Sequence, residues 1–115
     1  MPELPEVETV CRSLRPFLIG KTVEKCEVKE EKLIKSSTAA EFVQDICGST
    51  FTAVNRRGKY ILLETDKGET LVVHLRMTGK LLISDKTEEV GKHTHVRFIL
   101  NDDQKELRYD DTRKF

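Results

Sequence analysis

The first three residues, Met1-Pro2-Glu3, carry the clearest chemistry in the chain. Proline at the second position is small enough for the initiator methionine to be removed, which would leave the Pro2 nitrogen as a free secondary amine. An α-amine has a reference pKa of about 7.7–8.0, against about 10.4 for lysine, so a useful fraction is neutral and nucleophilic at physiological pH. Attack on a sugar aldehyde carbon would give an iminium, with Glu3 beside it as a candidate proton donor or acceptor.

The same stretch also suits a structural role. Pro5 fits the first position of a helix, and Glu6 and Glu8 complement the positive end of the helix dipole. On these residues alone, a helix start and a nucleophilic terminus stay open as alternatives.

A basic stretch, Arg56-Arg-Gly-Lys59, lies between two predicted strands. Its arginines and lysine, with the backbone freedom of Gly58 for close approach, suit a phosphate group. The alternative is an ordinary basic turn, which is the commoner explanation of so short a run.

Two further stretches place unusual side chains outside the predicted strands. In His74-Leu-Arg-Met-Thr-Gly79, Arg76 and Met77 occupy a predicted turn, where a methionine contributes little to a core. A flexible apolar wedge that enters a base stack would explain Met77, and a half-buried methionine under a loop is the alternative. Near the C-terminal end, Arg113 and Phe115 form a pair typical of base contact and stacking.

Length and composition predict one soluble domain with a real core, since 115 residues include 37% hydrophobic and 35% charged residues. Three cysteines without CxxC spacing fit a reducing compartment better than disulfides or a zinc site. His93 and His95 would share one face of a strand, but no carboxylate or thiol partner accompanies them, so we favour a role other than metal binding. Charged residues interrupt the N-terminal stretch, and no apolar run approaches the roughly 18 residues of a membrane span, which predicts a cytoplasmic protein.

The formal net charge is +0, from 20 basic and 20 acidic residues. A stand-alone nucleic-acid binder normally carries a basic excess. Three explanations stay open: nucleic acid is not the partner, the charges are segregated on the surface, or part of the binding apparatus lies outside this chain.

The apolar pattern predicts two helices and a run of strands. The first helix is expected from Pro5 to Arg15, because Pro16 disfavours helix at the preceding residue. The second follows a capping box at Thr38–Glu41 and stops at Gly48. Strands are predicted at residues 22–28, 50–55, 60–65, 70–75, 80–84, 95–100 and 105–109. The fold is therefore expected to be mainly β, a β-sandwich of short antiparallel strands with two helices over its edges or faces.

Five stretches, taken together and in order, resemble the formamidopyrimidine-DNA glycosylase family, the bacterial base-excision repair enzymes for oxidised purines. They are Pro2-Glu-Leu-Pro-Glu-Val-Glu-Thr9, Arg56-Arg-Gly-Lys-Tyr60, His74-Leu-Arg-Met-Thr-Gly79, His93-Thr-His-Val96 and Leu107-Arg-Tyr-Asp-Asp-Thr-Arg-Lys-Phe115. The related endonuclease VIII group, which removes oxidised pyrimidines, shares the terminal proline but usually has glycine in place of Leu4. A non-catalytic β-sandwich binding module is the alternative from another class, and the presence of both Pro2 and Glu3 argues against it.

The resemblance implies catalytic roles for residues at the N-terminus and in the basic stretch. Pro2 would attack C1′ of the damaged nucleotide, forming a Schiff base, and Glu3 would be the acid or base that assists opening of the sugar ring. Glu6 would support the site, and Lys59 would bind near the lesion or its phosphate and be needed for base removal. The N-terminal helix would thus be the catalytic one.

The resemblance also implies a DNA-binding set. His74 and Arg76 would hold backbone phosphates, while Met77, Arg113 and Phe115 would fill the gap left by the flipped-out base. His93 and Arg108 fall in matching stretches and complete the set. Flipping itself follows from chemistry, because the sugar carbon of a stacked nucleotide is shielded from attack.

The resemblance further implies that residues 1–115 are the N-terminal catalytic domain only. Family members continue into a helix–two-turn–helix domain and a zinc finger, so we expect no cofactor in this chain and one zinc in the C-terminal part. The expected partner is damaged double-stranded DNA, bound by a monomer near the bacterial nucleoid. The isolated chain is expected to be weak or inactive.

Overall fold

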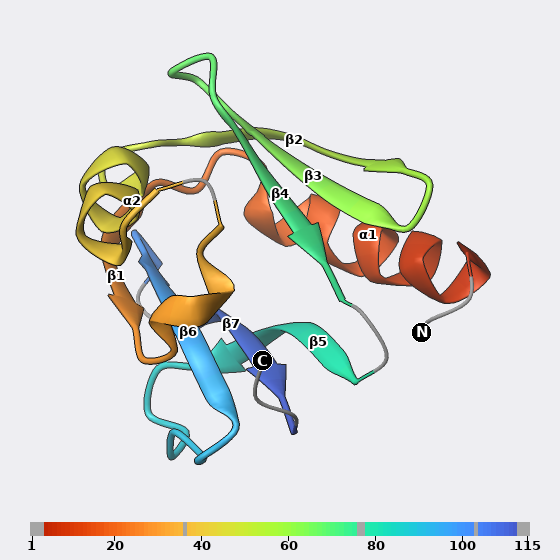
Figure 1. Cartoon of the computed structure of the whole chain (residues 1–115). Coiled ribbons are helices and arrows are strands. Elements are labelled where there is room, and N and C mark those ends of the chain that lie inside the picture. Colours follow the sequence, from red (N-terminus) through yellow and green to blue (C-terminus); the bar gives the residue numbers. More distant parts are fainter. Residues whose placement is uncertain (1–3, 36, 76–77, 103, 113–115) are drawn as a thin grey trace.

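Seven antiparallel strands in two sheets make up most of the fold, in a computed structural model that describes residues 4–35, 37–75, 78–102 and 104–112 (Figure 1). The four-stranded sheet joins, in spatial order, β1 (Val23–Val28), β6 (Thr94–Leu100), β7 (Lys105–Asp111) and β5 (Gly79–Asp85). The three-stranded sheet joins β2 (Phe51–Arg57), β3 (Tyr60–Thr65) and β4 (Thr70–His74). The predicted mainly β fold with two helices is confirmed.

The first helix, α1 (Leu4–Leu18), runs past its predicted end at Arg15. That prediction was wrong because Pro16 falls in the last turn, where a proline removes one backbone hydrogen bond, while full burial of Leu18 contributes about 1.5–3 kcal/mol. The buried stripe of the helix consists of Val7, Cys11, Leu14 and Leu18, each at most 1% exposed.

The second helix, α2 (Ala39–Ile46), begins at the predicted capping box. Thr38 Oγ1 accepts the amide hydrogen of Glu41 at 3.1 Å, and Glu41 Oε1 accepts that of Thr38 at 3.2 Å. Gly48, with a φ of +83°, follows the C-cap residue Cys47 and ends the helix as predicted. A short 3-10 helix, η1 (Glu31–Leu33), precedes α2 and was not predicted.

One apolar core lies between the two sheets and is extended by the helices. Helix α1 packs against β2, β3 and β5, which come from both sheets, and α2 packs against β1 (Figure 1). The buried strand residues include Phe51, Val54, Ile61 and Leu63 of the three-stranded sheet and Leu81, Phe98, Leu100 and Leu107 of the four-stranded sheet. Within the described residues, no helix is long and apolar enough to cross a bilayer.

Candidate functional site

A two-residue turn, Gly58-Lys59, joins β2 to β3 and carries the lysine predicted to act in base removal. Arg57 pairs with Tyr60 across the ladder, so Arg56 and Arg57 belong to β2 and not, as predicted, to the connection between strands. Gly58 has a φ of +60°, a left-handed conformation that glycine adopts without strain. Lys59 is half-buried on this tightly defined backbone.

Helix α1 lies along β2 and is fastened to it by side chains. Arg15 Nε donates to the carbonyl oxygen of Val54 at 2.6 Å. About one helical turn closer to the N-terminus, Cys11 Sγ donates to the carbonyl oxygen of Asn55 at 3.8 Å. The N-terminal end of α1 therefore points towards the end of β2 that leads into the Gly58-Lys59 turn (Figure 1).

Glu8, in the N-terminal half of α1, forms ion pairs with three guanidinium groups. Its carboxylate oxygens lie 3.3 Å from Arg15 Nη1, 3.4 Å from Arg56 Nε and 3.7 Å from Arg12 Nε. Desolvation raises the pKa of Glu8, but the hydrogen bonds from Arg56 and Arg15 outweigh it and hold the pKa below its ordinary value. Sequence reasoning assigned Glu8 only to the helix dipole. Glu6, the predicted supporting residue, is exposed in the first turn of the same helix.

Tyr60 and His74 form an aromatic pair beside the turn. They are cross-strand partners on β3 and β4, with ring centroids 4.7 Å apart and planes inclined by 37°. Tyr60 is 48% exposed, so the pair presents an aromatic surface directly after Lys59 in the chain. Sequence reasoning singled out His74 but not Tyr60. Counting back from the predicted turn at residues 66–69 pairs Tyr60 with Leu75, one residue away from the observed partner, so the turn alone did not reveal this pair.

Asp111, at the end of β7, ties together several segments that the sequence predicted to contact DNA. Thr78 Oγ1 donates to Asp111 Oδ1, and Tyr109 Oη donates to Asp111 Oδ2 at 3.4 Å. His95 Nε2 lies 2.7 Å from the carbonyl oxygen of Asp111, and the amide of Asp111 donates to the carbonyl of His93 at 2.9 Å. Asp111 is 1% exposed, so it holds these segments from the interior and was missed as a site residue.

Gly79 allows a close approach at the start of β5. A Cβ atom there would lie 2.3 Å from the carbonyl oxygen of Leu75 and 2.8 Å from Tyr109 Oη. The amide of Gly79 donates to that same carbonyl at 2.7 Å. The two ends of the stretch from residue 75 to residue 79 are therefore held together, with β7 packed beside them.

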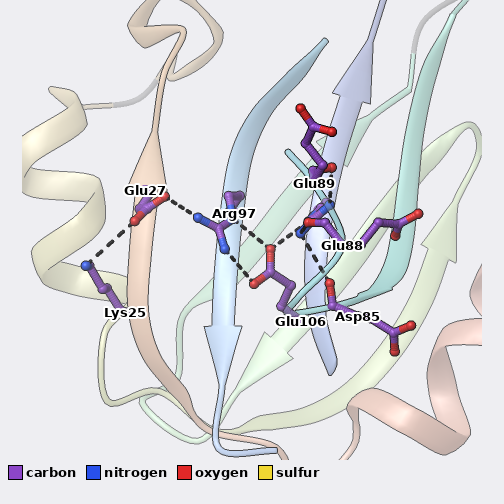
Figure 2. A network of polar contacts seen from close by, with 8 residues as sticks. Lys25, Glu27, Asp85, Glu88, Glu89, Arg97 and Glu106 are labelled. Carbon is purple, nitrogen blue, oxygen red and sulfur yellow. Dashed lines mark hydrogen bonds and ion pairs between the residues drawn. The ribbon is translucent and has the colours of Figure 1, made fainter. Parts of the chain in front are cut away.

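Arg108, which the sequence predicted to contact DNA, occupies the interior of the described structure. It is 3% exposed, and its Nε donates to Glu106 Oε2 at 2.6 Å. Its Nη2 donates to the carbonyl oxygens of Glu88 at 2.8 Å and Asp85 at 3.3 Å. Figure 2 shows the network around Glu106, whose other partner is the bidentate Arg97. Arg108 thus pins the charged loop after β5 to β7, a structural role.

Six of the predicted site residues lie outside the described residues: Pro2, Glu3, Arg76, Met77, Arg113 and Phe115. Of the described ones, Glu6 lies on α1 and Arg108 is buried on β7. Lys59 and His74 lie at the same end of the three-stranded sheet, and His93 lies just before β6 of the other sheet. The stretch from His74 to Gly79 connects the two sheets.

The cysteines of the described chain are packing groups. Burial raises the pKa of Cys11, and it raises the pKa of Cys26 to about 12, with Cys47 and Glu27 adding to the effect. A neutral buried thiol is a poor metal ligand. Within the described residues, no group of three His, Cys, Asp or Glu side chains could hold a metal ion.

Comparison with known proteins places the chain in a family. Residues 1–115 match the profile described as the formamidopyrimidine-DNA glycosylase N-terminal domain. Among curated relatives, the formamidopyrimidine-DNA glycosylases of Carboxydothermus hydrogenoformans and an Exiguobacterium species are 49% and 50% identical over 115 residues. Both alignments cover all of this chain, which spans 43% and 41% of those proteins.

Solved structures of the Lactococcus lactis formamidopyrimidine-DNA glycosylase have the same fold. A complex with DNA containing FAPY-dG has a TM-score of 0.90 at 32% identity, over 98% of this chain and 42% of that one. A complex with DNA containing an oxidised pyrimidine has a TM-score of 0.89 at 33% identity, over 99% of this chain and 42% of that one. The profile, the relatives and the shared fold agree with the motifs in the sequence, and the chain belongs to the formamidopyrimidine-DNA glycosylase family.

Proposed function

We propose that the protein carrying this chain is a base-excision repair DNA glycosylase that removes oxidised purines and then cleaves the abasic site. The observation that carries the proposal is the attachment of α1 to β2. Because Glu8 meets Arg56 and Arg15 meets Val54, the helix end that follows Pro2 and Glu3 lies towards the turn that bears Lys59. A nucleophile, a proton carrier and a cation can then act on one nucleotide.

The chemistry begins with the neutral Pro2 nitrogen. Its attack on C1′ forms a carbon–nitrogen bond and breaks the glycosidic bond, whose electron pair leaves with the damaged base, and the base takes up the proton that the Pro2 nitrogen loses. Glu3 delivers a proton to the sugar ring oxygen, the ring opens, and an iminium remains. The iminium withdraws electrons, so loss of the C2′ proton expels the 3′ phosphate. This second step is the lyase activity.

DNA is the proposed partner because the chemistry requires an extruded nucleotide and the surface beside Lys59 suits one. Lys59 and the exposed Arg57 offer cations for phosphates, and the Tyr60–His74 pair offers an aromatic face. Met77, Arg113 and Phe115 would fill the gap in the duplex. In relatives more than twice as long, the remaining chain, with a helix–two-turn–helix domain and a zinc finger, would supply the rest of the DNA grip.

The test is excision from matched duplexes by the complete protein with its native N-terminus. One duplex contains 7,8-dihydro-8-oxoguanine, a second contains an oxidised pyrimidine, and a third is undamaged. We expect release of the oxidised purine and strand cleavage at that position, with no reaction on the undamaged duplex. No release from any duplex, together with no covalent adduct on abasic DNA, would favour the non-catalytic binding module.

An oxidised-pyrimidine glycosylase is the second candidate, favoured by one specific observation. One structural neighbour with the same fold was solved with DNA containing an oxidised pyrimidine. Faster release of the pyrimidine than of the purine in the experiment above would establish this alternative, with the same Pro2 chemistry.

A further inference from the structure

A continuous line of contacts leads from α1 to the Gly58-Lys59 turn. Glu8 Oε1 lies 3.4 Å from Arg56 Nε. The same guanidinium donates through Nη1 to the carbonyl oxygen of Gly58 at 2.8 Å. That carbonyl belongs to the peptide bond of Lys59. Arg56 therefore bridges a helix carboxylate and the backbone of the turn with two different nitrogens.

We infer that Glu8 is a positioning residue that, through Arg56, fixes the Gly58-Lys59 turn relative to the N-terminal turn of α1. The inference rests on the proposed function, in which Lys59 acts in base removal and Pro2 is the nucleophile. Reactive groups on two separate elements need a fixed spacing, and a misplacement of about 1 Å can lower a rate by about 100-fold. The Glu8–Arg56 bridge spans those two elements.

Stability alone is a poor explanation of the bridge. The side chains of Glu8 and Arg56 are 30% and 31% exposed, and ion pairs this exposed contribute little to folding. Proton transfer by Glu8 is also a poor explanation. Arg15 and Arg12 supply two more guanidinium groups, which keep the carboxylate ionised and occupied. A carboxylate that joins a helix to a turn through a guanidinium is suited to holding geometry.

The functional test is a double-mutant cycle in the complete protein, with single-turnover release of 7,8-dihydro-8-oxoguanine as the readout. Glu8→Gln should lower the rate by about 10- to 100-fold. In a Lys59→Gln background, the same substitution should change the rate by less than about twofold, because residues that act through one another are not additive. Arg56→Lys, which keeps the cation but loses the two-nitrogen bridge, should match Glu8→Gln.

Controls separate positioning from loss of charge. Glu24 is exposed on β1, so Glu24→Gln removes one negative charge at a distance and should leave the rate unchanged. Borohydride trapping on a pre-formed abasic site needs Pro2 but not base removal, so Glu8→Gln should retain it. Fully additive losses in the cycle, or a wild-type rate for Glu8→Gln, would overturn the inference.

A second readout does not depend on activity. In amide NMR spectra, the resonances of Gly58 and Lys59 should shift in Glu8→Gln and in Arg56→Lys but not in Glu24→Gln. Unchanged resonances of Gly58 and Lys59 in Glu8→Gln would overturn the positioning role, whatever the activity of the protein. Shifted resonances in a protein that releases no base would keep the positioning role and reject the proposed function, so the two failures are distinguishable.

Discussion

At the scale of single residues, the mechanism that we propose has two parts, an amine and a carboxylate. In it, Pro2 would supply the nucleophile, and Glu3 would move a proton at the sugar. These two tasks respond differently to mutation, because a carboxamide keeps the shape of a carboxylate but carries no titratable proton.

Glu3→Gln should therefore slow base removal by about 10²–10⁴, the usual contribution of a general acid or base. DNA affinity of the complete protein should stay near normal, since the side chain keeps its size and hydrogen-bonding capacity. Single-turnover excision and a binding titration on the same duplex measure the two quantities. Equal losses of rate and affinity would make Glu3 a structural residue.

Glu106 is the residue on which the interior polar network depends. It is fully buried, accepts from Arg97 at 2.7 and 2.8 Å, and also binds Arg108 at 2.6 Å (Figure 2). Glu106→Gln would leave buried guanidinium charge unpaired, and we expect urea denaturation to show a loss of about 3–5 kcal/mol. The matched control is Glu27→Gln. Glu27 lies on β1, forms an ion pair with the same Arg97 and has a more exposed side chain. This substitution should change the free energy of unfolding by less than about 1 kcal/mol.

The pH dependence of stability gives a second reading of Glu106. Burial raises the pKa of this carboxyl group, but the hydrogen bonds and charges of Arg97 and Arg108 lower it by more than burial raises it. The pKa in the folded protein therefore lies below the ordinary value. Its contribution is therefore complete above the unfolded pKa of about 4.3 and is lost as pH falls through the lower folded pKa. The difference in free energy of unfolding between wild type and Glu106→Gln should become smaller in acid. A difference that stays constant between neutral pH and acid, or equal losses of stability in Glu106→Gln and Glu27→Gln, would contradict this role.

At the scale of elements, the sequence predicted what local signals determine. The capping box placed the start of α2, and alternating apolar residues placed the strands. The end of α1 was missed because burial of Leu18 is a tertiary effect that overrides the local preference set by Pro16. The extension of β2 through Arg57 was missed because pairing with Tyr60 decides it.

The candidate site was predictable only where its signal lies in the sequence itself. Lys59 and His74 could be singled out, whereas the burial of Arg108 depends on Glu106, two residues away on the same face, and on Arg97 across the ladder. Asp111 was missed because its role arises from backbone and side-chain partners on β6 and β7 and in the segments just before β5 and β6. Contacts of this kind follow from register, which motif spacing does not contain.

The segments that carry Met77 and Phe115 should act on the duplex, not on the chemistry. Met77→Ala and Phe115→Ala should slow excision of a stacked lesion more than cleavage of a pre-formed abasic site. Unstacking a base requires a few kcal/mol, and an abasic site has no base to extrude. The ratio of the two rates, measured on matched duplexes, checks this. An equal loss on both substrates would place these residues in general DNA binding.

At the scale of the whole molecule, the neutral charge of the chain limits what it can do alone. Phosphate contacts dominate DNA affinity, and a chain with 20 basic and 20 acidic residues has no net positive charge to contribute. The relatives devote more than half of their length to parts beyond the matched region. We therefore propose that those parts supply much of the DNA grip.

The isolated 115-residue chain should fold, because its core is formed by its own helices and strands. It should show at most weak adduct formation on abasic DNA and no release of 7,8-dihydro-8-oxoguanine. Circular dichroism and an excision assay at low salt, beside the complete protein, test both statements. Turnover by the isolated chain equal to that of the complete protein would show that these 115 residues alone supply the DNA-binding energy.

The most direct measurement addresses the Pro2 nitrogen itself. The complete protein is prepared with its native N-terminus and, as a matched form, with one residue added before Pro2, which converts the amine into an amide. Each form is mixed with abasic DNA and borohydride, and the adduct is mapped by mass spectrometry. We predict a covalent adduct on Pro2, with Met1 removed, in the native form and none in the extended form. An adduct of equal yield in the extended form would contradict the assignment of Pro2 as the nucleophile.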